Sequence, residues 1–229
     1  VALVTNRRGE NVTARPRELT GERRRQVLTR LSPLLGVPVA DLMAQMKAGE
    51  RPDAYFACDK SFMEEVTDLF LDPADISTNQ LVIMVQKGNP HQIGKLEDLA
   101  KPGLRVGIGH EKQCALGVLT QRTLTESKLQ SPVMKNVKVQ SPTGDLLVNQ
   151  LRTKSLDAII AYISNATAAG AELESIPVDI PCAIAIQPMA VGKESRYPNL
   201  TQRLMNEIRS QASREKFEKN GFRWVPKEA

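Results

Sequence analysis

Short apolar runs recur along the chain, and each is followed by a polar loop and then by an amphipathic pattern. The clearest runs are 54–58, 81–86, 104–108 and 158–161. Continuous apolar runs are expected of strands that are buried on both faces of a parallel sheet. The amphipathic segments between them have the 3.6-residue period of helices. Strands that alternate with helices predict an α/β protein with mostly parallel sheets flanked by helices.

The stretch 141–166 (SPTGDLLVNQLRTKSLDAIIAYISNA) shows this pattern most clearly. Its first turn ends at Thr143, a candidate N-cap, and Asp145 lies in the first turn of the expected helix. The buried strand 158–161 follows, with Tyr162 directly after it. Ligands bind at the carboxyl ends of strands in open α/β sheets, and a helix N-terminus offers N–H groups to an anion. The stretch therefore predicts half of a small-anion site.

A second strand end followed by a helix start lies near residue 58. The strand Ala54–Cys58 leads into a helix for which Ser61 is the expected N-cap, with Glu64 completing a capping box. The remaining expected elements are strands at 36–39, 137–139, 182–186 and 189–191, helices at 41–50, 96–100, 199–213 and 213–220, and a linker at 176–181.

Composition places the chain among ordinary globular proteins. Of its 229 residues, 41% are hydrophobic and 25% are charged, which is the usual balance. Aromatic residues make up 4%, which argues against nucleic-acid binding by base stacking. No apolar run approaches the roughly 20 residues that cross a bilayer, and the first residues, VALVTNRRGE, lack the apolar region of a secretory signal. For an exported protein, the signal would have to lie outside this sequence.

The positive charge is concentrated at the start of the sequence. Residues 1–30 hold eight Arg and three Glu, a balance of +5 that equals the net charge of the whole chain. Such a segment is typical of an arm that binds nucleic acid or an anionic membrane, or of a solvated extension. Because no aromatic or recognition-helix pattern accompanies the charge, we expect the extension and no nucleic-acid partner.

Metal, cofactor and catalytic patterns are weak. The three cysteines, Cys58, Cys114 and Cys182, lie far apart without a CxxC motif, so we expect free thiols, no metal site and no disulfide framework. Glycines 107 and 109 form a lone GxG, which does not indicate a nucleotide cofactor. Cys114 follows His110 by four residues, a spacing common by chance, so we do not expect an enzyme or catalytic residues.

Several segments together resemble the molybdate-binding component of ABC transporters, within the two-lobed periplasmic solute-binding proteins. They are MAQMKAGERPDAYFACDKSFMEE, LVIMVQKGNP, LEDLAKPGLRVGIGH, TGDLLVNQLRTKSLDAIIAYISNA and FEKNGFRW, in the order of the family and from about Leu42 to Trp224. The blocks KAGE-x-x-DAYF and LDAIIAY are the most specific, whereas the others are typical of the wider superfamily.

The resemblance implies a Venus-flytrap fold. One lobe would comprise residues 1–85 and 180–229, and the other residues 86–179. It also implies a tetrahedral oxyanion, molybdate or tungstate, held in the cleft by neutral donors and without a further cofactor. Carried over position by position, the ligand-binding residues would be Cys58 through its backbone, Gly144 and Asp145 through their amides, and Tyr162 through its hydroxyl.

The first 40 residues do not match the family, which opens with a strand and a loop that bears a hydroxyl ligand. Thr5 is the candidate for that ligand. The second family loop is shortened here, and Asp41, which lies near it, would repel an anion if it faced the cleft.

The resemblance implies a monomeric, periplasmic or extracytoplasmic protein that delivers its anion to the membrane permease of an ABC transporter. An alternative is the ligand-sensing effector domain of a transcription regulator with the same fold. A signal peptide in the full gene would favour the transporter component, and an upstream helix-turn-helix would favour the regulator.

Overall fold

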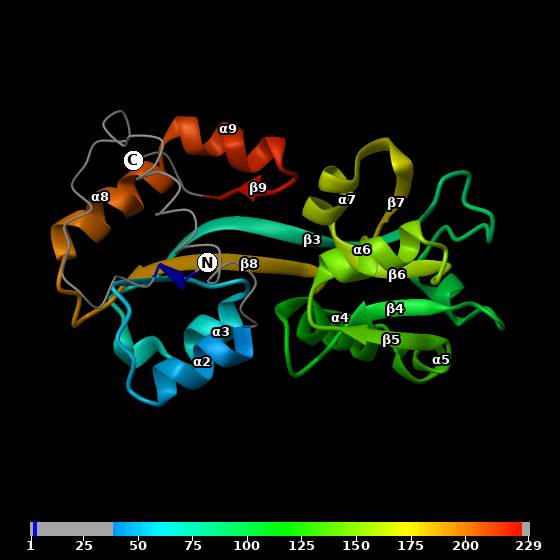
Figure 1. Cartoon of the computed structure of the whole chain (residues 1–229), viewed down its shortest axis with the longest axis horizontal. Helices are drawn as coiled ribbons and strands as arrows, with labels where there is room; N and C mark the ends of the chain where they lie inside the picture. The colour runs from blue at the N-terminus through cyan, green and yellow to red at the C-terminus, as the bar shows by residue number, and fades with distance from the viewer. Residues whose placement is uncertain (1, 4–38, 226–229) are drawn as a thin grey trace.

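The structure, a computed structural model, describes residues 2–3 and 39–225 (Figure 1). Its helices are α2 (Val39–Lys47), α3 (Lys60–Glu64), α4 (Ala115–Glu126), α5 (Gln130–Met134), α6 (Gly144–Arg152), α7 (Ile163–Ala169), α8 (Pro198–Ile208) and α9 (Gln211–Lys219), with short 3₁₀ helices at Thr67–Leu69, Leu96–Ala100 and Gly170–Glu172. Its strands are β1 (Ala2–Leu3), β2 (Ala54–Phe56), β3 (Ala74–Gln86), β4 (Val106–Gly109), β5 (Val137–Ser141), β6 (Ala158–Tyr162), β7 (Leu173–Pro177), β8 (Ile184–Val191) and β9 (Arg223–Trp224).

The long strand β3 connects two groups of elements, which lie at the left and right of Figure 1. Its first part, Ala74–Gln80, pairs antiparallel with β8 and β9, and its second part, Leu81–Gln86, pairs antiparallel with β6 and β7. We call residues 39–80 and 184–225 lobe 1 and residues 81–183 lobe 2. The two-lobed α/β fold is thereby confirmed, whereas the lobe limits expected at residues 85/86 and 179/180 stay a prediction.

Lobe 1 is built on β8, which pairs with β2 as well as with β3. One apolar cluster joins α2, β2 and α3 and includes Met43, Met46, Tyr55, Met63 and Phe70. A second cluster joins β3 and β8 to the C-terminal helices and includes Ile76, Met189, Met205 and Trp224. The sheet of lobe 1 therefore has apolar contacts on both faces, as the continuous apolar runs indicate.

Lobe 2 holds the parallel part of the sheet. Strand β4 lies between β5 and β6 and is parallel to both, whereas β3 runs antiparallel to every strand that it contacts. The four strands that pair with β3, namely β6, β7, β8 and β9, all follow it in sequence and run in the opposite direction. The core of lobe 2 joins these strands to α4 and α6 and includes the fully buried Ile83, Leu119, Leu147 and Ile159.

The structure differs from several of the strands and the linker expected from sequence. The expected strand at 36–39 is replaced at its last residue by the start of α2, and residues 36–38 lie outside the described part. The segment 176–181, expected to be a linker, begins within strand β7, which ends at Pro177. The two strands expected on either side of Pro188 form the single strand β8. Pro188 has no N–H, and it is tolerated beside a shift of register between Asp75 and Ser77 in β3.

The two lobes also contact each other beside β3. The buried Asn79 donates from Nδ2 to Oγ of Ser164 (2.9 Å) and accepts at Oδ1 from the Ser164 backbone N–H (3.4 Å), which ties β3 to α7. Gly221, between α9 and β9, lies directly against α7. A Cβ atom on Gly221 would collide with Oγ1 of Thr167 and would be 3.1 Å from the carbonyl oxygen of Ile163.

Replacing Gly221 tests this contact. Gly221 has a φ of +86°, so Gly221→Ala adds backbone strain as well as a collision with Thr167. Gly103 has a φ of +85° with no atom within 4 Å of an added Cβ, so Gly103→Ala adds the strain alone. We expect Gly103→Ala to lower the free energy of unfolding by about 1 kcal/mol and Gly221→Ala by about 2–4 kcal/mol in urea titrations. Equal losses would show that the lobes do not need this close approach.

A buried carboxylate predicts an acid-sensitive contribution to stability in lobe 2. Asp157 accepts hydrogen bonds from Nη2 (2.6 Å), Nε (3.1 Å) and the backbone N–H (2.8 Å) of Arg105, and these bonds hold the pKa of Asp157 below its usual value. A lowered folded-state pKa stabilises the protein fully above about pH 4, and the stabilisation is lost as the pH falls through that pKa.

Asp157→Asn should therefore be less stable than the parent at pH 7, and the difference should shrink toward pH 2–3, as measured by thermal unfolding across this range. A difference that stays constant with pH would mean that packing, and not the carboxylate charge, accounts for the loss.

Candidate functional site

Tyr162 ends β6 with a buried hydroxyl group. Among the residues that the structure describes, its Oη atom has no hydrogen-bond partner. The residue as a whole is half-buried, although its hydroxyl oxygen is fully buried. Burial, followed by the negative charges that Cys58, Asp59 and Cys114 carry when ionised, raises the pKa of Tyr162 well above its usual value. The hydroxyl therefore stays protonated and is available as a donor.

Helix α6 begins at the same end of the lobe 2 sheet. Thr143 is its N-cap, and Oγ1 of Thr143 accepts from the backbone N–H of Leu146 at 3.4 Å, as the sequence predicts. The amides of Gly144 and Asp145 in the first turn have no carbonyl partner within the helix. N–H groups at the positive end of a helix dipole are suited to an anion.

Asn165 of α7 links Tyr162 to the start of α6. Its Oδ1 accepts from the backbone N–H of Tyr162 (3.1 Å), and its Nδ2 donates to Oδ1 of Asp145 (3.0 Å). A Cβ atom on Gly144 would lie only 2.7 Å from Oδ1 of Asn165. This side chain thus packs against the glycine and engages the carboxylate of Asp145.

Lobe 1 contributes the loop between β2 and α3. Asp59 is the N-cap of α3, because its Oδ1 accepts from both the N–H (3.1 Å) and the Oγ (2.7 Å) of Ser61. The expectation that Ser61 caps this helix is therefore wrong, and a carboxylate two residues earlier takes that role. Cys58 precedes Asp59 and is exposed. Both residues lie close enough to Tyr162 for their charges to affect its pKa, although about 100 residues separate them in sequence.

Cys114 is a further neighbour of Tyr162 that the sequence assigned no binding role. It is the N-cap of the 12-residue helix α4, and its Sγ lies 3.6 Å from the carbonyl oxygen of Ser141 and 3.7 Å from that of His110. The ring of His110 is engaged elsewhere, because its Nδ1 accepts from the N–H of Lys112 at 3.2 Å. These contacts do not form the Cys–His pair that a nucleophilic enzyme would need.

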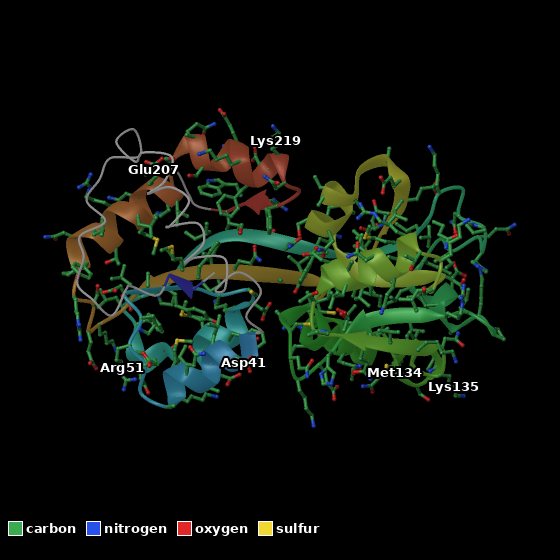
Figure 2. The ribbon with its side chains drawn as sticks, in the orientation of Figure 1. Asp41, Arg51, Met134, Lys135, Glu207 and Lys219 are labelled. Atoms are coloured by element: carbon green, nitrogen blue, oxygen red, sulfur yellow. The ribbon has the colours of Figure 1, made fainter. Side chains whose placement is uncertain are left out.

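Of the predicted ligand residues, Gly144, Asp145 and Tyr162 are linked through contacts with Asn165. A charge on Cys58 would raise the pKa of Tyr162. Thr5 lies outside the described residues. Asp41 is exposed at the start of α2, on the side of lobe 1 that faces lobe 2 in Figure 2.

Cys114 was not predicted as a neighbour of this site, and Asn165 was expected at the strand end after Tyr162 without a contact or role assigned to it. Asn165 could have been found as the third residue after a strand-end tyrosine, and Cys114 as the residue that precedes a helix after β4.

The arrangement supports noncovalent anion binding. It combines a protonated hydroxyl, two amides at a helix start and the charge of Arg122, which opposes the rise in the pKa of Tyr162. Within residues 39–225, no cluster of three or more His, Cys, Asp or Glu side chains could hold a metal ion. No helix in the described ranges is long and apolar enough to span a bilayer.

Comparisons with known proteins agree with this architecture. The family of bacterial extracellular solute-binding proteins matches residues 35–223. The molybdate-binding protein ModA of Mycobacterium tuberculosis is 24% identical over 188 residues, which are 80% of this chain and 70% of that protein.

Two solved structures have the same fold. The periplasmic molybdate-binding protein of Azotobacter vinelandii has a TM-score of 0.69 at 13% identity, covering 89% of this chain and 94% of its own. The sulfate-binding protein SubI of M. tuberculosis also has a TM-score of 0.69, at 17% identity, covering 82% of this chain and 74% of its own.

Proposed function

We propose that this chain, which belongs to the bacterial extracellular solute-binding protein family, captures a tetrahedral oxyanion between its two lobes. The observation that carries the proposal is the hydroxyl of Tyr162, which is buried and has no partner in the described part of the chain. A buried hydroxyl without a hydrogen bond costs about 1–3 kcal/mol. A ligand that accepts its proton in a hydrogen bond would remove that cost.

The donors suit an anion that gives up its water shell. Each donor is a neutral N–H or O–H group, and hydrogen bonds to a charged acceptor are roughly twice as strong as neutral ones. Because the raised pKa keeps Tyr162 protonated, binding should not depend on this group across the physiological pH range. The backbone N–H groups of Gly144 and Asp145 do not ionise in this pH range either.

We infer molybdate, with tungstate as its close chemical analogue, as the ligand. Support comes from the relative and the solved structure that are named molybdate-binding proteins. The similar structure named a sulfate-binding protein makes sulfate the ligand to test against them.

In this proposal, donors from both lobes close on the anion. Cys58 would contribute its backbone N–H from lobe 1, and Gly144, Asp145 and Tyr162 would contribute from lobe 2. Hinge closure around a ligand is the common behaviour of such proteins. The closed monomer would deliver its anion to the permease of an ABC transporter in the periplasm or another extracytoplasmic space. The effector-domain alternative stays a prediction.

Thermal unfolding with millimolar molybdate, tungstate, sulfate or phosphate tests the ligand class. A micromolar site adds about 4 kcal/mol to the stability of the folded protein at millimolar ligand. We expect a rise in melting temperature with molybdate and tungstate and none with phosphate. A rise with sulfate alone would mean that the site binds sulfate and not molybdate. No rise with any of these anions would contradict the proposal.

A further inference from the structure

A negative charge in the first turn of α6 opposes the binding of an anion there. Asp145 places an exposed carboxylate in the same turn whose backbone N–H groups are proposed to bind the oxyanion. A carboxylate near a helix N-terminus stabilises the helix, but it also repels an anion bound beside it. An anion site at this turn therefore needs a group that offsets the charge of Asp145.

Asn165 contacts this carboxylate from α7, which Figure 1 draws beside α6. Its Nδ2 donates to Oδ1 of Asp145 at 3.0 Å, across a separation of 20 residues in sequence. Its Oδ1 accepts from the backbone N–H of Tyr162 at 3.1 Å. Because the oxygen of a side-chain amide only accepts and its nitrogen only donates, the two contacts together allow one orientation of the Asn165 amide.

The two ends of the Asn165 amide have different roles. Asn165 is the third residue of α7, and the contact of its Oδ1 with the N–H of Tyr162 closes the start of that helix. A carboxylate oxygen accepts such a bond as well as an amide oxygen does. The Nδ2 group instead reaches α6, where a carboxylate at position 165 would have no proton to donate. The contact with Asp145 therefore requires the amide, whereas the start of α7 does not.

Three elements hold the Asn165 side chain in place. Gly144 lets it lie on the backbone of α6, because a Cβ atom on Gly144 would be 2.7 Å from Oδ1 and 3.0 Å from Nδ2 of Asn165. Ser164, the preceding residue, is bound to β3 by two contacts with Asn79. With the contact to Tyr162 at the end of β6, the first turn of α7 is fixed on β3, β6 and α6.

Building on the proposed function, we propose that Asn165 is a positioning residue of the oxyanion site. It acts through Tyr162 and Asp145 and not by contact with the anion. It holds the strand end that carries Tyr162 next to the start of α6, and it offsets the charge of Asp145 with a charge-assisted hydrogen bond. Donors from two separate segments are thereby held ready for one ligand, which is what a tight site requires.

Asn165→Asp tests the Nδ2 group alone. It keeps an acceptor for the N–H of Tyr162 and places an oxygen opposite the carboxylate of Asp145. We expect calorimetric titration to show molybdate binding about tenfold weaker, the lower end of the loss seen when a supporting residue is removed at metal sites. The control Asn149→Asp adds the same charge at an exposed position of α6, one turn after Asp145, and should change the affinity by less than about twofold.

A second background shows whether the effect passes through Asp145. With Asp145→Asn present, Asn165→Asp lets the amide at position 145 donate to the carboxylate at position 165, so the pair again has one donor and one charge. We expect Asn165→Asp to weaken binding by less than about threefold in this background, against about tenfold in the parent. Equal losses in the two backgrounds, or no loss in the parent, would overturn the proposal.

Two further results separate this proposal from a structural role and from the proposed function. If Asn165→Asp lowers the midpoint of ligand-free urea unfolding but leaves molybdate affinity unchanged, Asn165 serves the fold alone and the proposal is wrong. A parent chain that binds no oxyanion would refute the proposed function and this proposal together. A parent chain that binds molybdate no better than Asn165→Asp does would refute this proposal alone.

Discussion

Tyr162→Phe is expected to weaken oxyanion binding by about 10- to 150-fold, because the change removes one charge-assisted hydrogen bond worth about 1.5–3 kcal/mol. The same change should not lower the stability of the ligand-free protein, since the hydroxyl has no hydrogen-bond partner within the described residues. Removing an unpaired buried hydroxyl can even stabilise the fold. Calorimetric titration with molybdate, together with urea unfolding without ligand, measures both effects.

Weaker oxyanion binding without a loss of ligand-free stability distinguishes a ligand-binding tyrosine from a structural one. The matched control is Tyr55→Phe, because Tyr55 is buried in lobe 1 and its hydroxyl contacts Sδ of Met43 at 3.7 Å. That variant should leave molybdate affinity unchanged. An unchanged affinity in Tyr162→Phe, or a clear loss of ligand-free stability, would remove Tyr162 from the site.

Leu147→Ala is expected to lower the free energy of unfolding by about 2–5 kcal/mol, the range for deleting a buried leucine side chain. Leu147 has no exposed surface and lies in the first turns of α6, just after Gly144 and Asp145. Its methyl groups fill the space beside Gly107, where an added Cβ would be 3.0 Å from Cδ2 of Leu147. The cavity would therefore loosen the helix start from the sheet.

The neighbouring residue provides the control. Leu146 precedes Leu147 on the same helix but is 49% exposed. Leu146→Ala should change stability by no more than about 0.5 kcal/mol. Urea unfolding of both variants makes the comparison at equal helix propensity. Similar losses in the two would mean that α6 does not pack as described.

The elements that sequence predicts best are those with a continuous apolar run. Strands β2 and β6 and the second part of β3 were expected from such runs. The first part of β3 was not, because its buried positions include Ser77 and Asn79, whose polar side chains bond across the fold to Gln187 and Ser164. The apolar pattern does not reveal a strand whose buried polar groups are paired with distant residues.

The sequence predicted the separate segments of the site but not the contacts between them. The strand end at Tyr162 and the helix start at Gly144 follow from local patterns and from the family resemblance. Asn165, which joins them, is visible only once α6 and α7 are placed side by side, and the proximity of Cys58 to Tyr162 depends on how the lobes pack. Such long-range contacts have no local signature. The ligand roles of these residues remain predictions.

Crystals grown with tungstate and measured at a tungsten absorption edge give the most direct test of the oxyanion site. We predict one strong anomalous peak between the lobes, with oxygens bonded to the Tyr162 hydroxyl, the amides of Gly144 and Asp145, and the backbone N–H of Cys58. A peak elsewhere, or no peak in protein that is otherwise folded as described, would contradict it.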